Sequence, residues 1–305
     1  MQVVVGTRGS QLALTQTEEV LARLKLLSDH ICPKVVEIKS TGDAMSTTPL
    51  AKLGKGIFIK ELETALLQGK IDMAVHSLKD LPVELAGGLS VVVVCQRQDP
   101  RDVLISNADR PLAEMKPGAI IGTSSPRRLA QLMALRSDLN VEPIRGNVET
   151  RLNKAFGPDY DGVVVAAAGV ARLGLESRIA QYFSTLDMVP EPGQGALGVE
   201  IRSENKDLFG ILSQIEDTQT STAVTAERAF VEEMGGGCKV PIAAHASLDG
   251  NTLHIVGMVA SEDGCQIVKT HMEFASDEPL IAGSAIAQKL MSMGAADILK
   301  MDANS

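Results

Sequence analysis

Short apolar runs separated by amphipathic stretches make up the first two thirds of the chain. Each run ends in a polar turn, after which apolar residues recur every three or four positions, as in a strand followed by a helix. Strands are expected at residues 2–5, 34–39, 71–74, 89–95, 119–121, 141–144, 162–167 and 196–201. One face of the first helix is expected at Ala13, Thr17, Val20, Leu24 and Leu27. Alternating strands and helices predict an α/β fold that begins as a parallel sheet.

The last ninety or so residues follow a different pattern. A helix through Ala223 and Phe230 is expected to stop at three consecutive glycines, residues 235–237. Three strands are then expected, at 242–248, 253–260 and 266–274, joined by turns with hairpin chemistry at 249–251 and 262–264. A final helix is expected over 279–293. This order predicts a small α+β domain with a three-stranded sheet.

Two stretches rich in proline, glycine and polar residues, 96–101 and 188–195, are expected to cross between lobes. We therefore expect domain 1 to comprise residues 1–96 and 191–215, domain 2 residues 97–190, and domain 3 residues 216–305. Two α/β lobes joined by paired crossings predict a cleft between them and hinge motion about it.

The composition excludes several classes of protein. The 305 residues carry 29 Lys and Arg against 38 Asp and Glu, with no Trp and only two Tyr, so both phosphate attraction and base stacking are weak and nucleic-acid binding is not expected. No apolar run approaches the roughly 20 residues of a membrane helix, and the first residues do not resemble a signal peptide. Four cysteines without a C-x-x-C pair predict a cytoplasmic protein with reduced thiols and no metal site.

The two α/β halves open with similar turns. Residues 5–10 and 121–127 both read as a strand end, a Gly-Thr turn and a helix start. Backbone N–H groups at a helix start form an anion site, to which Ser10 and Ser125 can contribute. Pro126 suits the first helical position. Plain helix capping by the two serines is the alternative.

Arginines add further candidate anion-binding groups. Helix starts or strand ends are the expected positions of Arg127, Arg128, Arg145 and Arg151, and Arg172 follows another strand. An arginine can hold a carboxylate with two parallel hydrogen bonds. Several arginines at one cleft predict a ligand with several carboxylates or phosphates, whereas solvated surface arginines are the alternative for any one of them. No nucleotide-binding glycine motif is present, so the anion is not expected to be a nucleotide.

Two further residues are candidates for chemistry. Asp80 lies in the polar stretch that follows the apolar run 71–74, beside Lys79 and near His76, where an acid/base group is plausible and a solvated turn is the alternative. Cys238 follows the three glycines and precedes Lys239, so it is either a reactive thiol or a buried structural cysteine.

With these pieces assembled, the chain resembles the porphobilinogen deaminase family, also called hydroxymethylbilane synthase. The resemblance runs essentially from end to end. Its motifs stand at residues 6–10, 55–58, 75–82, 122–128, 145–147, 193–196 and 236–238, in the family's order. It implies two periplasmic-binding-protein-like (type 2) domains around a cleft, followed by an α+β domain that carries the cofactor.

The resemblance also implies the chemistry. Cys238 would hold a dipyrromethane cofactor through a thioether, and four porphobilinogen molecules would be added head to tail with loss of ammonia before water releases hydroxymethylbilane. Asp80 would be catalytic, stabilising a cationic azafulvene and shuttling protons. The implied cofactor-binding residues are Lys79, Asp80, Thr123, Ser125, Arg127, Arg128 and Arg145. The implied substrate-binding residues are Arg8, Ser10, Lys52, Lys55, Phe58, Ser77, Arg145, Asn147, Arg151, Arg172 and Gln194. The protein is expected to act as a monomer.

The polar stretch 41–56 would act as a lid that Lys52 and Lys55 help to close, with Phe58 stacking near the incoming ring. The family pattern has two glycines where Leu53-Gly54-Lys55 has one, which leaves the role of Lys55 open. Two other functions remain as alternatives: a non-catalytic cytosolic sensor of a small polycarboxylate, and a transferase acting on a phosphorylated substrate.

Overall fold

The computed structural model describes residues 1–27, 30–39, 59–107, 109–235 and 241–303. Residues 300–303 are described by their backbone only. The chain divides into two compact units, one of residues 1–98 and 195–221 and one of residues 99–194 and 222–305. The chain passes between the units at 98–99, 194–195 and 221–222, and the first two passages lie inside the stretches expected as crossings. The division into three domains and the cleft between the two α/β lobes remain predictions.

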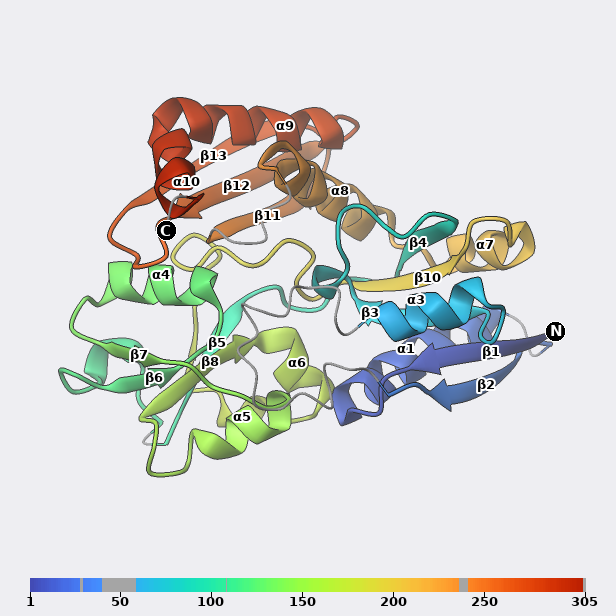
Figure 1. Cartoon of the computed structure of the whole chain (residues 1–305), viewed down its shortest axis with the longest axis horizontal. Helices are drawn as coiled ribbons and strands as arrows, with labels where there is room; N and C mark the ends of the chain where they lie inside the picture. Colours follow the sequence, from blue (N-terminus) through green and yellow to red (C-terminus); the bar gives the residue numbers. More distant parts are fainter. Residues whose placement is uncertain (28–29, 40–58, 108, 236–240, 304–305) are drawn as a thin grey trace. The chain divides into compact units, whose positions relative to one another are not determined.

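The first unit is built on a five-stranded sheet in the order β2-β1-β3-β10-β4 (Figure 1). Its strands are β1 (Gln2–Thr7), β2 (Cys32–Glu37), β3 (Met73–Ser77), β4 (Leu89–Val94) and β10 (Leu197–Arg202). Its helices are α1 (Gln11–Leu27), α3 (Lys60–Leu67) and α7 (Lys206–Leu212), with short 3-10 turns at Leu78–Asp80 and Ser213–Ile215. β1 is parallel to β2 and β3, whereas β10, which returns from the second unit, is antiparallel to β3 and β4.

Side-chain alternation along these strands sends apolar residues to both faces of the sheet. On one face Val75 and Val199 pack with Val20 and Leu24 of α1. On the other face Ala74 packs with residues of α3 that include Leu62 and Leu66. The prediction for α1 is wrong at Leu27, the last residue of the helix, which is 41% exposed. Gln16, which the pattern did not include, is buried, and its amide donates a hydrogen bond to the Ser77 hydroxyl.

The second unit contains another five-stranded sheet, in the order β7-β6-β8-β5-β9. Its strands are β5 (Asp102–Ser106), β6 (Ile120–Gly122), β7 (Asn140–Glu142), β8 (Gly162–Ala166) and β9 (Gln181–Tyr182). Its helices are α4 (Pro126–Leu135), α5 (Val148–Lys154) and α6 (Ala167–Arg172), with 3-10 turns at Leu112–Glu114 and Glu176–Arg178. The sequence patterns missed β5 and β9. β5 is short and directly follows the polar crossing, and β9 has only two residues.

The C-terminal part of the second unit is a three-stranded antiparallel sheet under two long helices (Figure 1). It comprises α8 (Thr218–Glu233), β11 (Ile242–Asp249), β12 (Thr252–Ala260), β13 (Ile267–Ala275), α9 (Pro279–Leu290) and α10 (Ala296–Ala303). One apolar core, which includes Phe230, Ile255 and Ile286, joins α8 and α9 to one sheet face. The predicted single helix over 279–293 is interrupted by a π turn, Met291–Ala295, in which Gly294 has a positive φ of 107°. Two five-stranded α/β sheets and this three-stranded sheet confirm the expected fold class.

The other face of the three-stranded sheet packs against α4. Ala243, Val256 and Met258 form a buried apolar cluster with Ala130 of α4. The hairpin turn at Gly264 approaches so closely that a Cβ there would lie 2.9 Å from the Ala130 backbone. The second α/β sheet and the C-terminal sheet are therefore parts of one packed body, with α4 between them.

Substituting Gly283 with alanine is expected to destabilise the C-terminal part. A Cβ at Gly283 of α9 would lie 2.3 Å from the Ala226 carbonyl oxygen and 2.8 Å from the Phe230 nitrogen, so α8 and α9 must separate. Overpacking of this kind costs about 1–3 kcal/mol, which thermal unfolding would record as a lower Tm. Gly210→Ala in α7 is the matched control, because no atom lies within 4 Å of its added Cβ. Equal Tm values for the two variants would contradict the close packing.

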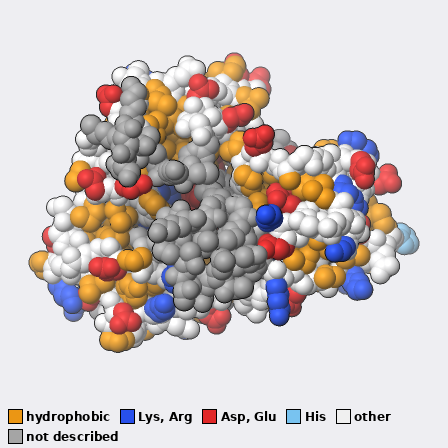
Figure 2. Space-filling model, in the orientation of Figure 1, with side chains coloured by type: hydrophobic (Ala, Val, Ile, Leu, Met, Phe, Trp, Pro, Cys, Tyr) orange, Lys and Arg blue, Asp and Glu red, His pale blue; other side chains and the backbone are white. Residues whose placement is uncertain are grey.

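Charges are dispersed over the surface. On the face shown in Figure 2, acidic and basic side chains of the described residues lie interspersed with apolar ones. This distribution accompanies a net charge of −9. Among the described residues, no helix combines the length and the apolar character needed to span a membrane.

Candidate functional site

The first unit brings one group of predicted site residues to a single edge of its sheet. β1 and β3 are parallel neighbours, so the residues that follow them leave the sheet at the same edge. Arg8 and Ser10 follow β1, whereas Lys79 and Asp80 follow β3. Gln16 of α1, the helix that follows β1, donates a hydrogen bond to the Ser77 hydroxyl (2.7 Å) and so ties α1 to the end of β3.

Asp80 is the last residue of a one-turn 3-10 helix whose first residue, Leu78, is held against the sheet. The Leu78 backbone N–H donates to the Ala196 carbonyl oxygen (3.0 Å), and the Leu78 side chain is 1% exposed. Asp80 itself is half-buried. The expected neighbour His76 lies elsewhere: it is a buried residue of β3 whose Nε2 is 3.1 Å from Glu200 Oε2. The expected strand 71–74 is thus displaced to 73–77, and His76 belongs to the interior of the sheet.

The second unit brings a larger group of predicted residues to the carboxyl edge of its parallel strands. The loop after β6 and the loop after β7 are joined by Ser124, whose Oγ donates to the Ile144 carbonyl (2.7 Å) and accepts from the Ile144 N–H (3.0 Å). The backbone N–H of the buried Thr123 donates a hydrogen bond to the Glu142 carbonyl oxygen (2.9 Å). Because β6 is parallel to both β7 and β8, the loops that follow these strands leave the sheet at the same edge.

The helices at this edge are capped by their own side chains. Ser125 is the N-cap of α4 and accepts from the Arg128 N–H (3.4 Å), and Pro126 is the first helical residue, as predicted. Asn147 is the N-cap of α5 and accepts from the Thr150 N–H (2.9 Å). In the first unit Ser10 accepts from the Ala13 N–H (3.3 Å). The serines therefore perform the capping function that the sequence left as the alternative.

Arg127 and Arg128, in the first turn of α4, converge on a residue that the sequence patterns did not single out. Arg127 Nη1 lies 2.7 Å from Asp102 Oδ2, and Arg128 binds Asp102 Oδ1 through Nη2 (2.8 Å) and Nε (3.1 Å). Each arginine is 5% exposed and Asp102 is fully buried. Asp102 begins β5, which runs antiparallel to β8 with Asp102 opposite Ala166, so it lies at the same edge as the loops above.

The protonation of Asp102 is set by opposing effects. Burial raises the pKa of its carboxyl, but the charges and hydrogen bonds of Arg127 and Arg128 outweigh burial and hold that pKa far below its ordinary range. The carboxylate is therefore ionised at neutral pH. With two arginines on one carboxylate, the cluster keeps an excess positive charge.

Within the part of the chain that the structure describes, two arginines retain buried N–H groups without a hydrogen-bond partner. These are Nε and Nη2 of Arg127 and Nη2 of Arg145. A buried donor left unpaired costs about 1–3 kcal/mol, and a charged one more, so these atoms are expected to meet an acceptor supplied by a ligand. Arg128 differs, because its Nη1 also reaches the Val164 carbonyl oxygen (3.3 Å) and all three of its nitrogens have protein acceptors.

The remaining predicted arginines and Gln194 have other surroundings. Arg151 lies within α5 instead of at a helix start, and its Nε donates to the Gly146 carbonyl oxygen (2.9 Å). Arg172 is the last residue of α6. Gln194, expected to bind substrate, is fully buried and donates to Asp102 Oδ1 (2.9 Å) and to the Pro100 carbonyl oxygen (2.7 Å).

Four predicted residues, Lys52, Lys55, Phe58 and Cys238, lie outside the described residues, and so does the expected lid over 41–56. Their roles remain expectations from sequence. The described residues therefore offer two groups: an acidic one in the first unit, at Asp80, and a basic one in the second unit, centred on Arg127.

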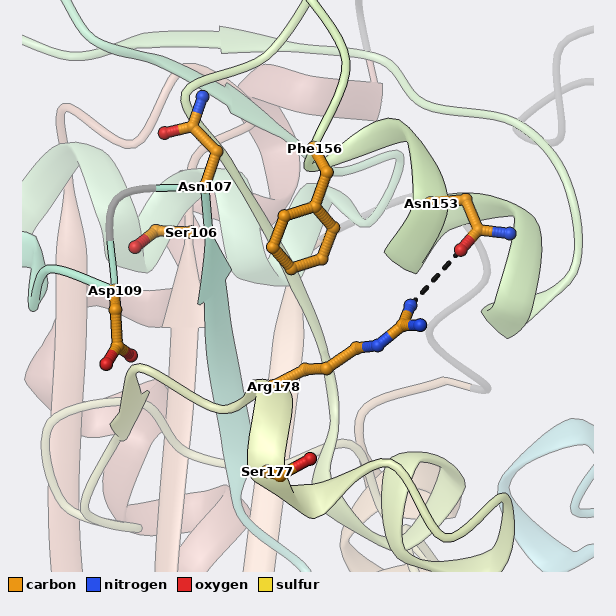
Figure 3. Close-up of a pocket in the computed structure, with 7 residues that line it drawn as sticks. All are labelled: Ser106, Asn107, Asp109, Asn153, Phe156, Ser177 and Arg178. Carbon is orange, nitrogen blue, oxygen red and sulfur yellow. Dashed lines mark hydrogen bonds between the residues drawn. The ribbon is translucent and has the colours of Figure 1, made fainter.

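A pocket of about 480 Å³ lies in the second unit (Figure 3). Its wall includes the half-exposed Phe156 and Arg178, whose Nη1 donates to Asn153 Oδ1 (3.1 Å). Ser106, at the far end of β5 from Asp102, also lines it, so the pocket lies at the opposite edge of the sheet from the arginine cluster. Among the predicted site residues that the structure describes, none lines this pocket.

Asp102, the buried partner of Arg127 and Arg128, is a candidate-site residue that the sequence patterns do not single out, although a signal for it exists. An acidic residue directly before the apolar run Val103-Leu104-Ile105 marks the start of a buried strand. A charge at such a position needs a buried partner. The sequence patterns do not predict this strand, and Asp102 lies directly after the expected crossing 96–101.

Comparison with protein families gives matches over most of the chain. A family model described as "Porphobilinogen deaminase, dipyromethane cofactor binding domain" matches residues 3–209. A second, described as "Porphobilinogen deaminase, C-terminal domain", matches residues 221–292.

Similar whole proteins carry the same name. Porphobilinogen deaminase of Natranaerobius thermophilus is 45% identical over 305 residues, which covers 98% of this chain and 98% of that protein. Porphobilinogen deaminase of Syntrophomonas wolfei is 46% identical over 296 residues, with 97% of each chain covered. Among solved structures, a putative lipoprotein from Actinomyces odontolyticus superposes with a TM-score of 0.44 at 14% identity, covering 70% of this chain and 89% of that one.

Proposed function

Because the chain belongs to the porphobilinogen deaminase family, we propose that it is a transferase that joins four porphobilinogen molecules head to tail, with loss of ammonia, and releases hydroxymethylbilane. The growing chain starts on a covalently held dipyrromethane. This is a step of tetrapyrrole and haem biosynthesis. The observation that supports it most directly is the pair of unpartnered buried N–H groups of Arg127, because each pyrrole unit of substrate and cofactor carries two carboxylates.

In this proposal the arginine cluster neutralises the acetate and propionate groups. Arg127 Nε and Nη2 can hold one carboxylate by two parallel hydrogen bonds, and Arg145 Nη2 offers a further donor from the next loop. Arg128 acts indirectly by fixing Asp102, since its own nitrogens are occupied. Thr123, Ser125 and Asn147 shape the loops that present these donors, and the remaining predicted side chains extend the anion site.

Asp80 is proposed as the catalytic residue. Loss of ammonia from porphobilinogen leaves a cation on the substrate's pyrrole and methylene carbon, which a carboxylate beside the pyrrole nitrogen stabilises. In its protonated form the same group can give a proton to the departing amine, and the carboxylate this leaves can take up the proton released when the ring regains aromaticity. The fixed 3-10 turn suits this work, because the Leu78 hydrogen bond to Ala196 limits the movement of Asp80.

The dipyrromethane fits the donors that the structure presents. The buried guanidinium N–H groups that have no partner among the described residues need a hydrogen-bond acceptor, and the carboxylates of the cofactor can supply it. Cys238 would hold it by a thioether, with Lys79, Asp80 and the arginine cluster around it. When bound, the cofactor supplies the free pyrrole α-carbon to which the first substrate is joined.

The remaining assignments are part of the same proposal. Residues 41–56 would close over the site with Lys52 and Lys55, and Phe58 would stack on the incoming ring. Of the four cysteines, the described Cys32 and Cys265 are exposed free thiols, which supports a cytoplasmic location. We also propose that the protein acts without nucleic acid and as a monomer of three domains.

Intact mass of the purified protein tests the function. In a host that makes porphobilinogen, the wild-type mass should exceed the sequence mass by one dipyrromethane, and the excess should be absent from Cys238→Ala. Cys265→Ala serves as the control, because this exposed thiol should be replaceable without loss of the adduct. A wild type without an adduct would contradict the proposal and favour a non-catalytic polycarboxylate sensor.

A further inference from the structure

Glu227 of α8 is a fully buried carboxylate outside the candidate site. Its Oε2 accepts from the Gly193 N–H (2.7 Å) and its Oε1 from the Ala246 N–H of β11 (2.8 Å). His245 Nδ1 lies 3.3 Å from Oε1. Burying a charge costs free energy unless hydrogen bonds compensate it. We therefore ask which elements the hydrogen bonds of Glu227 join.

On one side Glu227 connects the two elements that border Cys238. α8 ends at Glu233 and β11 begins at Ile242, so Cys238 lies between them in the chain. The carboxylate bonds β11 at Ala246 from within α8, which fixes the two borders of the cysteine segment against each other. Glu227 thus adds a polar link to the apolar core in which Phe230 of α8 packs with Ala244 of β11.

On the other side Glu227 reaches the arginine cluster through the Gly193-Gln194 turn. Gly193 has a positive φ of 78°, which favours glycine, and it presents its N–H to Glu227. The next side chain, Gln194, donates to Asp102 Oδ1 (2.9 Å). Asp102 in turn binds both arginines of α4. Hydrogen bonds therefore link β11 to Glu227 and Glu227 to Gly193, the peptide bond leads on to Gln194, and hydrogen bonds continue from Gln194 through Asp102 to the guanidinium groups.

We propose that Glu227 is a positioning residue that holds the borders of the Cys238 segment in register with the arginine cluster, so that one dipyrromethane can meet the thiol and the arginines together. The inference rests on the proposed function, because it concerns loading of the proposed cofactor. Glu227 acts through Gln194 and Asp102 and does not itself touch the cofactor. Its loss impairs cofactor capture more than turnover by molecules that are already loaded.

Glu227→Gln tests this with little change in volume. A glutamine amide turns one acceptor into a donor and leaves one of the two backbone N–H groups unmatched. The unloaded full-length chain is mixed with porphobilinogen, and the loaded fraction is followed by intact mass. Loading is expected to be at least about tenfold slower than in wild type, with kcat per loaded molecule nearly unchanged.

Ile286→Ala separates positioning from general stability. Ile286 is a fully buried core residue of α9, so its truncation lowers Tm without touching the hydrogen-bond series. We expect this variant to load at nearly the wild-type rate. Wild-type loading in Glu227→Gln, or equally slow loading in Ile286→Ala, would overturn the proposal. A wild type that never loads would instead refute the proposed function.

A double-mutant cycle tests the connection to the arginines. If Glu227 acts through Gln194, then Gln194→Leu should slow loading by itself, and adding Glu227→Gln should slow it by much less than the product of the single effects. Independent multiplicative effects would show that Glu227 does not act through Gln194 and would contradict the series.

Discussion

Replacing Asp80 with asparagine is expected to lower turnover of porphobilinogen by about two to four orders of magnitude. Asparagine keeps the size of the side chain but has no negative charge and no basic oxygen to stabilise the substrate cation or move its protons. Asp80 is half-buried at the end of a fixed turn, and Leu78 anchors that turn independently of the carboxylate. The variant should therefore fold normally and carry the dipyrromethane.

Steady-state rates, intact mass and Tm together test this expectation. Glu84→Gln is a matched control, because it removes the same charge from an exposed position four residues further along the chain. The control should retain nearly wild-type turnover. An Asp80→Asn enzyme that is loaded and turns over at the wild-type rate would remove Asp80 from the chemical step.

Replacing Asp102 with asparagine is expected to have the largest effect on stability. Two buried guanidinium groups would lose their common carboxylate, and removing one partner of a buried ion pair costs about 3–5 kcal/mol. Tm should fall by about 10 °C or more. The side chain of Arg127 would also lose the bond that orients it, so the loaded fraction measured by intact mass should fall.

Acid unfolding supplies an independent readout of Asp102. Its carboxyl pKa is held below the ordinary value of 3.8, so the unfolded chain binds the proton more readily. The stability that Asp102 contributes is therefore complete above about pH 4 and declines as pH falls below that value. In Asp102→Asn the free energy of unfolding should depend less steeply on pH in this acid range.

Asp138→Asn is the control for both Asp102 measurements. Asp138 pairs with Arg136 in the same unit, but on the surface, where water and salt weaken the attraction. Its replacement should leave Tm and cofactor loading nearly unchanged. If Asp102→Asn behaved like Asp138→Asn, the buried cluster would not contribute to the anion site.

The strands and turns of the candidate site could be predicted because their signals are local. The apolar run before Asp80 and the Ser-Pro start of α4 are read from a few neighbouring residues, and α4 begins at Pro126 as expected. The resemblance at seven motifs then gave the family. Local patterns also assigned a three-stranded sheet to the C-terminal part, because hairpin turns at Gly250 and Gly264 punctuate it.

The pairing of charges could not be predicted, because it depends on strands that meet only in the folded sheet. β5 runs antiparallel between β8 and β9, which carries Asp102 to the start of α4. His76 was placed beside Asp80 from its position in the sequence, yet the alternation of β3 turns it toward Glu200 on β10, a strand more than a hundred residues away. Such contacts follow from topology, which a linear pattern does not contain.

The most direct test of the central claim, that Asp80 and the arginine cluster serve one ligand, is a crystal structure of the loaded wild-type protein. We expect the cofactor to extend from the Cys238 sulfur with a carboxylate on Arg127 Nε and Nη2 and with its pyrrole nitrogens facing the Asp80 carboxylate. A structure in which Asp80 faces a cavity separate from the one that holds the cofactor would contradict the claim.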